Sequence, residues 1–210
     1  MNRAQRLAAG LAAVGVTPDG DVLEQLERWL ALHARWSRRM NLTGARTDAE
    51  LIDRHLVDCA AIVRFLPAGA LTDVGSGAGL PGLVVAMMEP DRPMFLLEPL
   101  QRRAAFLEHA VLELGLGQVQ VVAARSEQWR PPQALAGVLA RAVAPLERLV
   151  SLCAPLLGPG TSLLAMKGPG WRDEVASLAP GWQLKASDHY RLPGRDHDHV
   201  LLRIEQEEGA

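Results

Sequence analysis

A glycine-rich loop follows a short apolar run, and it constrains the fold more than any other feature of this chain. The run Leu71 to Val74 has the length of a buried strand, and the chain continues Gly75-Ser76-Gly77-Ala78-Gly79-Leu80-Pro81-Gly82. Glycines at alternate positions let the backbone turn tightly and approach a ligand that side chains would exclude. The helix expected after the loop would begin with unpaired N–H groups. This order predicts half of a nucleoside-binding sheet.

Two acidic residues narrow the choice of nucleoside. Glu98 ends the next apolar run, where a carboxylate can accept hydrogen bonds from two ribose hydroxyls. Gly77, Gly79 and Gly82 also fit the G-x-G-x-x-G pattern of dinucleotide sites, so the loop alone does not decide. Asp73 precedes the loop by two residues and would repel a pyrophosphate but attract a cation. S-adenosylmethionine, with its sulfonium and ammonium, suits such a loop, and we expect it as the cofactor, with S-adenosylhomocysteine as product.

Short apolar runs alternate with amphipathic stretches after residue 70, which indicates a parallel sheet with helices on both faces. The predicted strands are Leu71 to Val74, Met94 to Leu97, Val119 to Ala123, Val138 to Ala140 and Ser162 to Met166. The predicted helices between them are Leu80 to Met88, Gln101 to Leu114 and Leu146 to Leu157. We therefore expect an α/β, Rossmann-like fold with a mostly parallel sheet.

The two ends of the chain depart from this alternation. Residues 1–69 have helical apolar spacing, with a break at Thr17-Pro18-Asp19 and a further helix that Asp48 can cap. Trp182 to Tyr190 and His199 to Ile204 resemble two strands with no helix between them, as in a terminal antiparallel hairpin. We expect an N-terminal helical extension, 1–69, packed on a sheet domain, 70–210.

Composition and charge place the chain among ordinary globular proteins. It has 210 residues, is 49% hydrophobic and 22% charged, and carries a net charge of -2, which disfavours a generally basic nucleic-acid binder but not a local basic face. The apolar runs are too short to cross a bilayer, and we expect no signal peptide. Cys59 and Cys153 cannot form a disulfide framework or a cysteine-based zinc site. A cytoplasmic protein, with nothing that requires an obligate dimer, is the simplest expectation.

Several segments, in order over residues 20 to 170, resemble one family, the RsmG (GidB) methyltransferases of bacterial small-subunit ribosomal RNA. They are Asn41-Leu42-Thr43 with Arg46, Arg54-His55-Leu56-Val57-Asp58, the glycine loop, Leu97-Glu98, Arg102-Arg103 before Phe106-Leu107, Arg125-Ser126-Glu127, Arg141-Ala142 and Lys167-Gly168. The resemblance implies a Rossmann-like methyltransferase that transfers a methyl group from S-adenosylmethionine to N7 of a guanine.

The resemblance also implies cofactor contacts. Gly75 and Leu80 would line the loop, Ser126 and Glu127 would border the adenine, and Arg141 would lie against the methionine side. The predicted positions agree, because Ser126-Glu127 and Arg141 follow strands at the carboxyl-end rim where ligands of parallel sheets bind. A salt bridge from Arg141 to Asp73 or Glu127 is the structural alternative.

The chemistry needs little from side chains. Guanine N7 has an in-plane lone pair and no proton, so it can attack the methyl carbon in line without a general base, and the enzyme supplies proximity and alignment. A cation near guanine O6 would hold the base. Arg141 and Lys167, at neighbouring strand ends, are the predicted positioning residues. For Lys167 the alternative is a solvated lysine at a strand end.

An RNA-facing surface is predicted from basic residues near the same rim, whose phosphate contacts would make affinity depend on salt. The candidates are Arg46, Arg54, His55, Arg102, Arg103 and Arg125, with Arg35, Arg38, Arg39 and Arg130 nearby. Each arginine taken singly is more often part of a solvated helix face, and for His55 packing is slightly favoured over an RNA contact.

We expect no metal site. His197 and His199 alternate along a strand and share a face, but no third ligand is evident. Asp198 stands where the family often carries a basic residue, so no RNA contact is predicted there.

Three other functions stay open at this stage. The loop also fits an NAD-dependent oxidoreductase, and the acidic net charge fits a methyltransferase for small molecules. A non-catalytic ribosomal RNA assembly factor would retain the fold, although Glu98 and the intact loop argue against it. For the RNA methyltransferase we expect a small ribosomal subunit or its precursor particle as partner, a monomeric enzyme and no membrane.

Overall fold

The computed structural model describes residues 1–207 and contains one seven-stranded sheet in the order β3-β2-β1-β4-β5-β7-β6. Strands β1 to β5 are parallel, β7 is antiparallel to β5, and β6 is antiparallel to β7. The strands are β1 (Leu71–Val74), β2 (Met94–Leu97), β3 (Val119–Val122), β4 (Gly137–Arg141), β5 (Ser162–Lys167), β6 (Trp182–Tyr190) and β7 (His199–Gln206). The predicted parallel sheet and its terminal antiparallel hairpin are confirmed.

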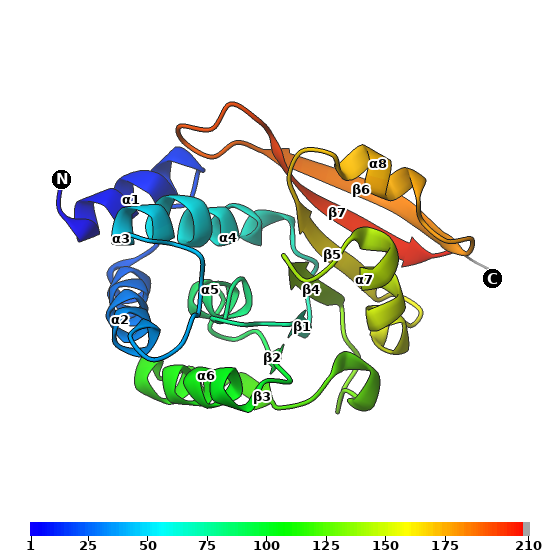
Figure 1. Ribbon diagram of the computed structural model, residues 1–210, viewed down its shortest axis with the longest axis horizontal. Helices are drawn as coiled ribbons and strands as arrows, with labels where there is room; N and C mark the ends of the chain where they lie inside the picture. The colour runs from blue at the N-terminus through cyan, green and yellow to red at the C-terminus, as the bar shows by residue number, and fades with distance from the viewer. Residues whose placement is uncertain (208–210) are drawn as a thin grey trace.

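Helices cover both faces of the sheet (Figure 1). On one face α5 (Gly82–Met88) and α6 (Gln101–Leu114) share a core with the N-terminal helices. On the other, α7 (Leu146–Cys153) and the 3-10 turn η4 (Ala154–Leu156) pack in a second core, with Trp171 of α8 (Trp171–Ala176) against its edge. The 3-10 turn η3 (Ser126–Gln128) follows β3. Two layers of apolar side chains thus enclose the buried strands.

The N-terminal region is helical and packs on the sheet side that carries α5 and α6 (Figure 1). It contains α1 (Arg3–Ala13), α2 (Gly20–Ser37), α3 (Asp48–Leu51), the π-helical turn η1 (Ile52–Leu56), α4 (Val57–Ala61) and the 3-10 turn η2 (Val63–Phe65). Leu7, Leu26 and Leu56 are fully buried in the same core as Leu83 and Leu96. The packing therefore accords with the expected extension, although the division at residue 69 stays a prediction.

Two details of the helices differ from the sequence prediction. Asp19 caps α2 as expected, but Thr47 rather than Asp48 caps α3, because the Thr47 side chain accepts the N–H of Glu50. Helix α8 lies between β5 and β6, where no helix was expected. It has only six residues and none is buried, so it lacks the apolar stripe by which helices are recognised. Within residues 1–207, no helix has both the length and the apolar character to cross a bilayer.

Candidate functional site

The glycine loop connects β1 to α5 at the carboxyl end of the sheet. Gly75 and Gly79 have φ angles of 70° and 81°, a region that favours glycine. A Cβ on Gly79 would collide with Leu83, and one on Gly75 would lie 3.0 Å from Val143 Cγ2. The N–H groups of Gly79 and Leu80 both donate to the carbonyl of Ser76, at 2.7 and 3.1 Å. The loop is therefore closely packed and presents backbone, not side chains, at this rim.

Asp73 lies beneath the loop. Its side chain is 1% exposed, and Oδ2 accepts the N–H of Gly82 at 3.0 Å, so the first N–H of α5 is already paired. Burial raises the pKa of this carboxyl to about 7, and the hydrogen bond from Gly82 opposes that rise. The sequence prediction placed Asp73 near a cationic ligand. In the structure its carboxylate accepts a hydrogen bond from Gly82, at the end of the loop, and so stabilises the loop conformation.

Glu98 is the acidic residue on the neighbouring strand end. Oε2 accepts the N–H of Gly77 at 3.0 Å, and Oε1 accepts the N–H of Leu100 at 2.9 Å. The side chain is 2% exposed, so it is held in one position beside the loop. Each carboxylate oxygen can accept a further hydrogen bond. The expected pairing of glycine loop and acid is present.

Arg141 ends β4 and is the centre of a polar cluster. Its Nη1 lies 3.1 Å from Oδ2 of Asp58, and its Nη2 donates to Nδ1 of His55 at 2.8 Å. The hydroxyl of Tyr190 donates to Oδ1 of Asp58 at 2.7 Å, and Nδ1 of His199 lies 3.6 Å from the same oxygen. The predicted alternative partners Asp73 and Glu127 were wrong, because the counterion comes from the N-terminal helices.

His55 is neutral in this cluster. Burial and then the charge of Arg141 lower the pKa of its imidazole to about 4. A neutral ring that accepts a hydrogen bond offers no positive charge to a phosphate. The structure thus shows His55 packed against Arg141, as in the packing alternative, and an RNA contact by His55 stays a prediction.

A cavity of about 360 Å³ opens beside Arg141, which is ample for one nucleobase. Its walls come from α4 and η1, the ends of β4 and β5, and the β6–β7 hairpin; they are His55, Asp58, Arg141, Ala142, Met166, Lys167, Gly168, Tyr190 and His199. Ala142 has φ 55°, the one positive φ outside glycine in the described residues. Ala142 thus turns the backbone between two neighbours. Arg141 before it lines the cavity, and the side chain of Val143 after it lies next to Gly75 of the glycine loop. The cavity and the glycine loop therefore adjoin.

Lys167 is held by the protein rather than solvated. Its Nζ donates to the carbonyl of Ala144 at 3.0 Å and lies 2.6 Å from Oε2 of Glu174, which also accepts the N–H of Leu146 at 2.7 Å. The side chain is only 13% exposed. Its ammonium therefore fixes the segment after Arg141, and one N–H remains for the cavity that Lys167 also lines.

Ser126 and Glu127 lie at the rim after β3. The hydroxyl of Ser126 is buried, 2.8 Å from the carbonyl of Leu152 and 3.0 Å from Oε2 of Glu127. Hydrogen bonds from its own backbone N–H and from Ser126 lower the pKa of Glu127, whose side chain is exposed. Glu127 is therefore a fixed carboxylate facing solvent near the predicted adenine position.

Known proteins with similar sequences identify the family of this chain. The family model for rRNA small subunit methyltransferase G matches residues 22–201. This chain belongs to that family. It is 46% identical over 187 residues to Ribosomal RNA small subunit methyltransferase G of Halorhodospira halophila, covering 89% of this chain and 88% of the relative. The relative of the same name from Marinobacter nauticus is 37% identical over 203 residues, covering 97% and 95%.

Solved structures show the same fold at much lower identity. Magnesium protoporphyrin IX methyltransferase from Synechocystis, solved with bound S-adenosylmethionine, has a TM-score of 0.58 at 13% identity and covers 90% of this chain and 98% of that one. TrmN from Thermus thermophilus has a TM-score of 0.55 at 21% identity and covers 88% and 53%. This member of the methyltransferase G family therefore has the Rossmann-like fold of S-adenosylmethionine-dependent methyltransferases.

The predicted RNA-facing arginines come from several different elements in this family member. Arg46 and Arg103 lie near the segment joining α2 to α3, where Nη2 of Arg103 is 3.5 Å from the carbonyl of Asn41. Arg102 lies in a groove between α2 and α6. Arg54 pairs with Glu50 one helical turn away, and Arg125 is exposed after β3.

Sequence reasoning missed Asp58 and Tyr190 as members of the site. Asp58 is the one charged residue in the short helix α4, whose other residues, Val57, Cys59, Ala60 and Ala61, are apolar and buried. A buried acid among apolar residues requires a partner, and that was the available signal. Tyr190 ends β6 with a buried hydroxyl, for which spacing gave no signal.

Proposed function

We propose that this protein transfers a methyl group from S-adenosylmethionine to N7 of a guanine in bacterial small-subunit ribosomal RNA. The observation that carries the proposal is Arg141, held by Asp58 and His55 in the wall of a base-sized cavity that adjoins the glycine loop. Membership of the methyltransferase G family supports the reaction class and the RNA substrate.

The residues at the rim fit S-adenosylmethionine. Gly75 has φ 70°, and a Cβ there would come within 3.0 Å of Val143 Cγ2, so the loop would present only its backbone to the cofactor at this point. Glu98 beside it would accept the ribose hydroxyls, and Ser126 and Glu127 would border the adenine. Gly77, Gly79 and Leu80 would line the loop, and Asp73 would act through it. When bound, the cofactor supplies a methyl group made electrophilic by the sulfonium.

The cavity would hold the guanine, and Arg141 would hold its orientation. A guanidinium has five N–H groups, and Asp58 and His55 occupy one each, so donors remain for guanine O6. Lys167 keeps the segment after Arg141 in place and has one N–H left for the base. N7 has no proton to lose, so no side chain needs to act as a base. Position and exclusion of water are the contributions of the chain.

The test is transfer of labelled methyl from S-adenosylmethionine to undermethylated small ribosomal subunits, with the modified nucleoside identified by mass. We expect 7-methylguanosine, formed faster on particles than on protein-free RNA. Gly75→Ala should abolish cofactor binding and transfer. Gly160→Ala is the matched control, because Gly160 has φ 78° but open space around it.

Other outcomes separate the alternatives. A different methylated nucleoside would refute the N7 assignment. Binding of a nicotinamide dinucleotide in place of S-adenosylmethionine would favour an oxidoreductase. Cofactor binding with transfer only to metabolites would favour a small-molecule methyltransferase. A Gly75→Ala variant that still supports ribosome maturation without transfer would favour an assembly factor.

A further inference from the structure

A groove of about 860 Å³ lies between the end of α2 and one side of α6, from Arg102 to Glu113, and shares no lining residue with the base-sized cavity. Four arginines and one glutamate are among its lining residues, which are Arg35, Trp36, Arg38, Arg39, Met40, Arg102, Ala105, His109 and Glu113. The chain as a whole has a net charge of -2, so this concentration of positive charge is local. We call it the arginine groove.

The guanidinium groups of three of the four arginines have no hydrogen-bond or ion-pair partner among the side chains and backbone of residues 1–207. Glu113 is already paired, with Arg35 at 2.6 Å and His109 at 3.0 Å. Arg38, Arg39 and Arg102 are exposed and make no side-chain hydrogen bond or ion pair within residues 1–207. Like charges placed together repel one another, so an anionic ligand would relieve a cost that the folded chain leaves uncompensated.

Helix ends do not account for this arrangement. Arg35 and Arg38 lie at the C-terminal end of α2, where the helix dipole favours cations. Arg102 and Arg103, however, lie in the first turn of α6, where the dipole favours acids, and that turn contains none. Arginines thus lie both at a helix end where the dipole favours positive charge and at one where it does not. This arrangement suits an anion bound between the two helices.

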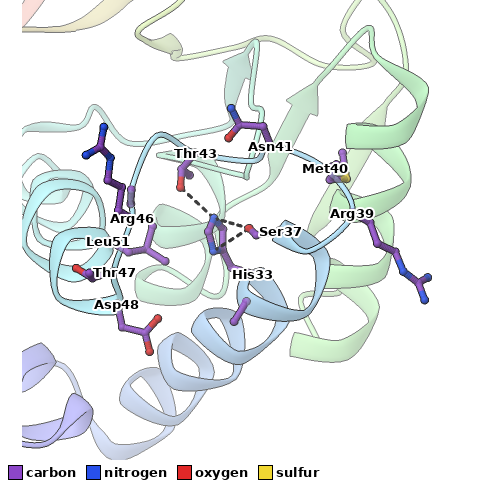
Figure 2. A pocket seen from close by; sticks show the side chains of 12 residues that line it. His33, Ser37, Arg39, Met40, Asn41, Thr43, Arg46, Thr47, Asp48 and Leu51 are labelled. Atoms are coloured by element: carbon purple, nitrogen blue, oxygen red, sulfur yellow. Dashed lines mark hydrogen bonds between the residues drawn. The ribbon is translucent and has the colours of Figure 1, made fainter.

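The groove continues past Arg39 and Met40 into a second hollow of about 560 Å³, which those two residues also line. Figure 2 shows Arg39 and Arg46 projecting outward from opposite sides of this hollow, with the His33 ring between Thr43 and Ser37 inside it. Nε2 of His33 lies 3.1 Å from the hydroxyl of Thr43. Basic side chains thus line a path along the segment that joins α2 to α3.

We propose that the arginine groove binds the sugar-phosphate backbone of the RNA substrate at nucleotides outside the reacting base. This inference rests on the proposed function, since it assigns a docking surface to the same substrate. Guanidinium groups suit phosphate oxygens because they offer planar, paired donors. The ring of Trp36 packs edge-on against the ring of Phe106, with 5.7 Å between the ring centroids, and is half-buried. Trp36 therefore forms the floor of the groove and is not a surface on which a base could stack. The contacts are therefore to phosphates and carry no sequence preference.

The experiment compares the triple variant Arg38→Ala, Arg39→Ala, Arg102→Ala with a charge-matched control, Arg148→Ala, Arg172→Ala, Lys185→Ala, whose residues lie in α7, α8 and the edge strand β6 and do not line the groove. Binding of protein-free small-subunit ribosomal RNA is measured at several salt concentrations, and S-adenosylhomocysteine binding by calorimetry. Loss of three phosphate contacts should reduce the slope of log affinity against log salt by about 2 to 3. At 0.1 M salt this corresponds to about a hundredfold to a thousandfold weaker binding. The control should bind RNA as the wild type does.

Three outcomes separate the arginine groove from the proposed function. Weaker RNA binding with a reduced salt slope, and unchanged S-adenosylhomocysteine binding, supports the groove. A triple variant whose RNA affinity falls less than threefold, or no more than that of the control, overturns the groove and leaves the proposed function standing. A wild-type protein that binds S-adenosylhomocysteine but neither binds nor methylates RNA overturns both, and that failure is visible before any variant is made.

Discussion

The ion pair between Asp58 and Arg141 gives the sharpest test of how the cavity is built. Asp58 lies in α4, and Arg141 ends β4, 83 residues later in the chain. Their side chains are 10% and 15% exposed, so the pair is largely removed from water. The prediction concerns the single variants Asp58→Asn and Arg141→Met and the double variant that combines them.

The magnitude follows from burial. Removing one partner of a buried pair leaves an uncompensated charge and costs about 3 to 5 kcal/mol, whereas replacing both partners by neutral groups is often nearly neutral. The slight exposure here favours the lower value, about 3 kcal/mol for each single variant. Asn keeps an oxygen that can accept the Tyr190 hydroxyl, so that hydrogen bond survives in Asp58→Asn. The double variant should cost about 3 kcal/mol or less, not 6.

The assay is urea unfolding of the four proteins, followed by tryptophan fluorescence and by circular dichroism at neutral pH. The expected coupling free energy is about 3 kcal/mol, at the upper end for residues in contact. Tyr190→Phe is the control, since it removes only the hydroxyl bond and should cost about 1 to 2 kcal/mol. Additive single variants, within 0.5 kcal/mol or so, would refute the reasoning, because the two groups would then act independently.

Three further predictions follow from single contacts. Gly79→Ala should lower the free energy of unfolding by at least about 1 kcal/mol more than Gly115→Ala, because both have positive φ but only Gly79 lacks space for a Cβ; urea unfolding of both variants checks this. The free energy of unfolding should rise as pH increases from 4 to 6.5, because folding lowers the pKa of His55 to about 4 and the folded protein therefore binds fewer protons than the unfolded chain. The His55 contribution to this rise should be about 1 to 2 kcal/mol, after allowance for the exposed part of the ring. Urea unfolding at a series of pH values should show that His55→Gln lacks this contribution. Glu174→Gln should reduce kcat for RNA methylation about tenfold or more with little change in KM for S-adenosylmethionine, since it weakens the hold on Lys167; an unchanged kcat would show that Lys167 needs no such partner.

The strands could be predicted from the sequence because parallel strands buried on both faces are continuous apolar runs. Leu71–Val74 and Met94–Leu97 agree with the structure at both ends. Helix α8 could not be predicted, since a six-residue helix after Gly168-Pro169-Gly170 with no buried residue carries no periodic signal. Local pattern is therefore sufficient where burial imposes it, and insufficient where a short helix lies on the surface.

The candidate site divides in the same way. Asp73, the glycine loop and Glu98 lie close together because the carboxyl ends of neighbouring parallel strands must meet, and this rule is readable from sequence. The counterion of Arg141 was not readable, because Asp58 reaches it from another region of the chain through tertiary packing. The rule for strand ends considers only residues on the sheet, and so it suggested Asp73 and Glu127.

These contacts give the N-terminal helices two connections to the sheet. Asp58 and His55 hold Arg141, and Nε1 of Trp29 donates to the carbonyl of Ala78 in the glycine loop at 3.3 Å. Trp29 lies in α2, which has 18 residues, is about 27 Å long and ends at the arginine groove. A helix that is bonded to the loop at one point and carries arginines at its end would fix the distance between the proposed RNA backbone site and the proposed cofactor site. On this proposal the sheet would determine where the methyl donor lies, and the N-terminal helices would determine where the RNA lies relative to it.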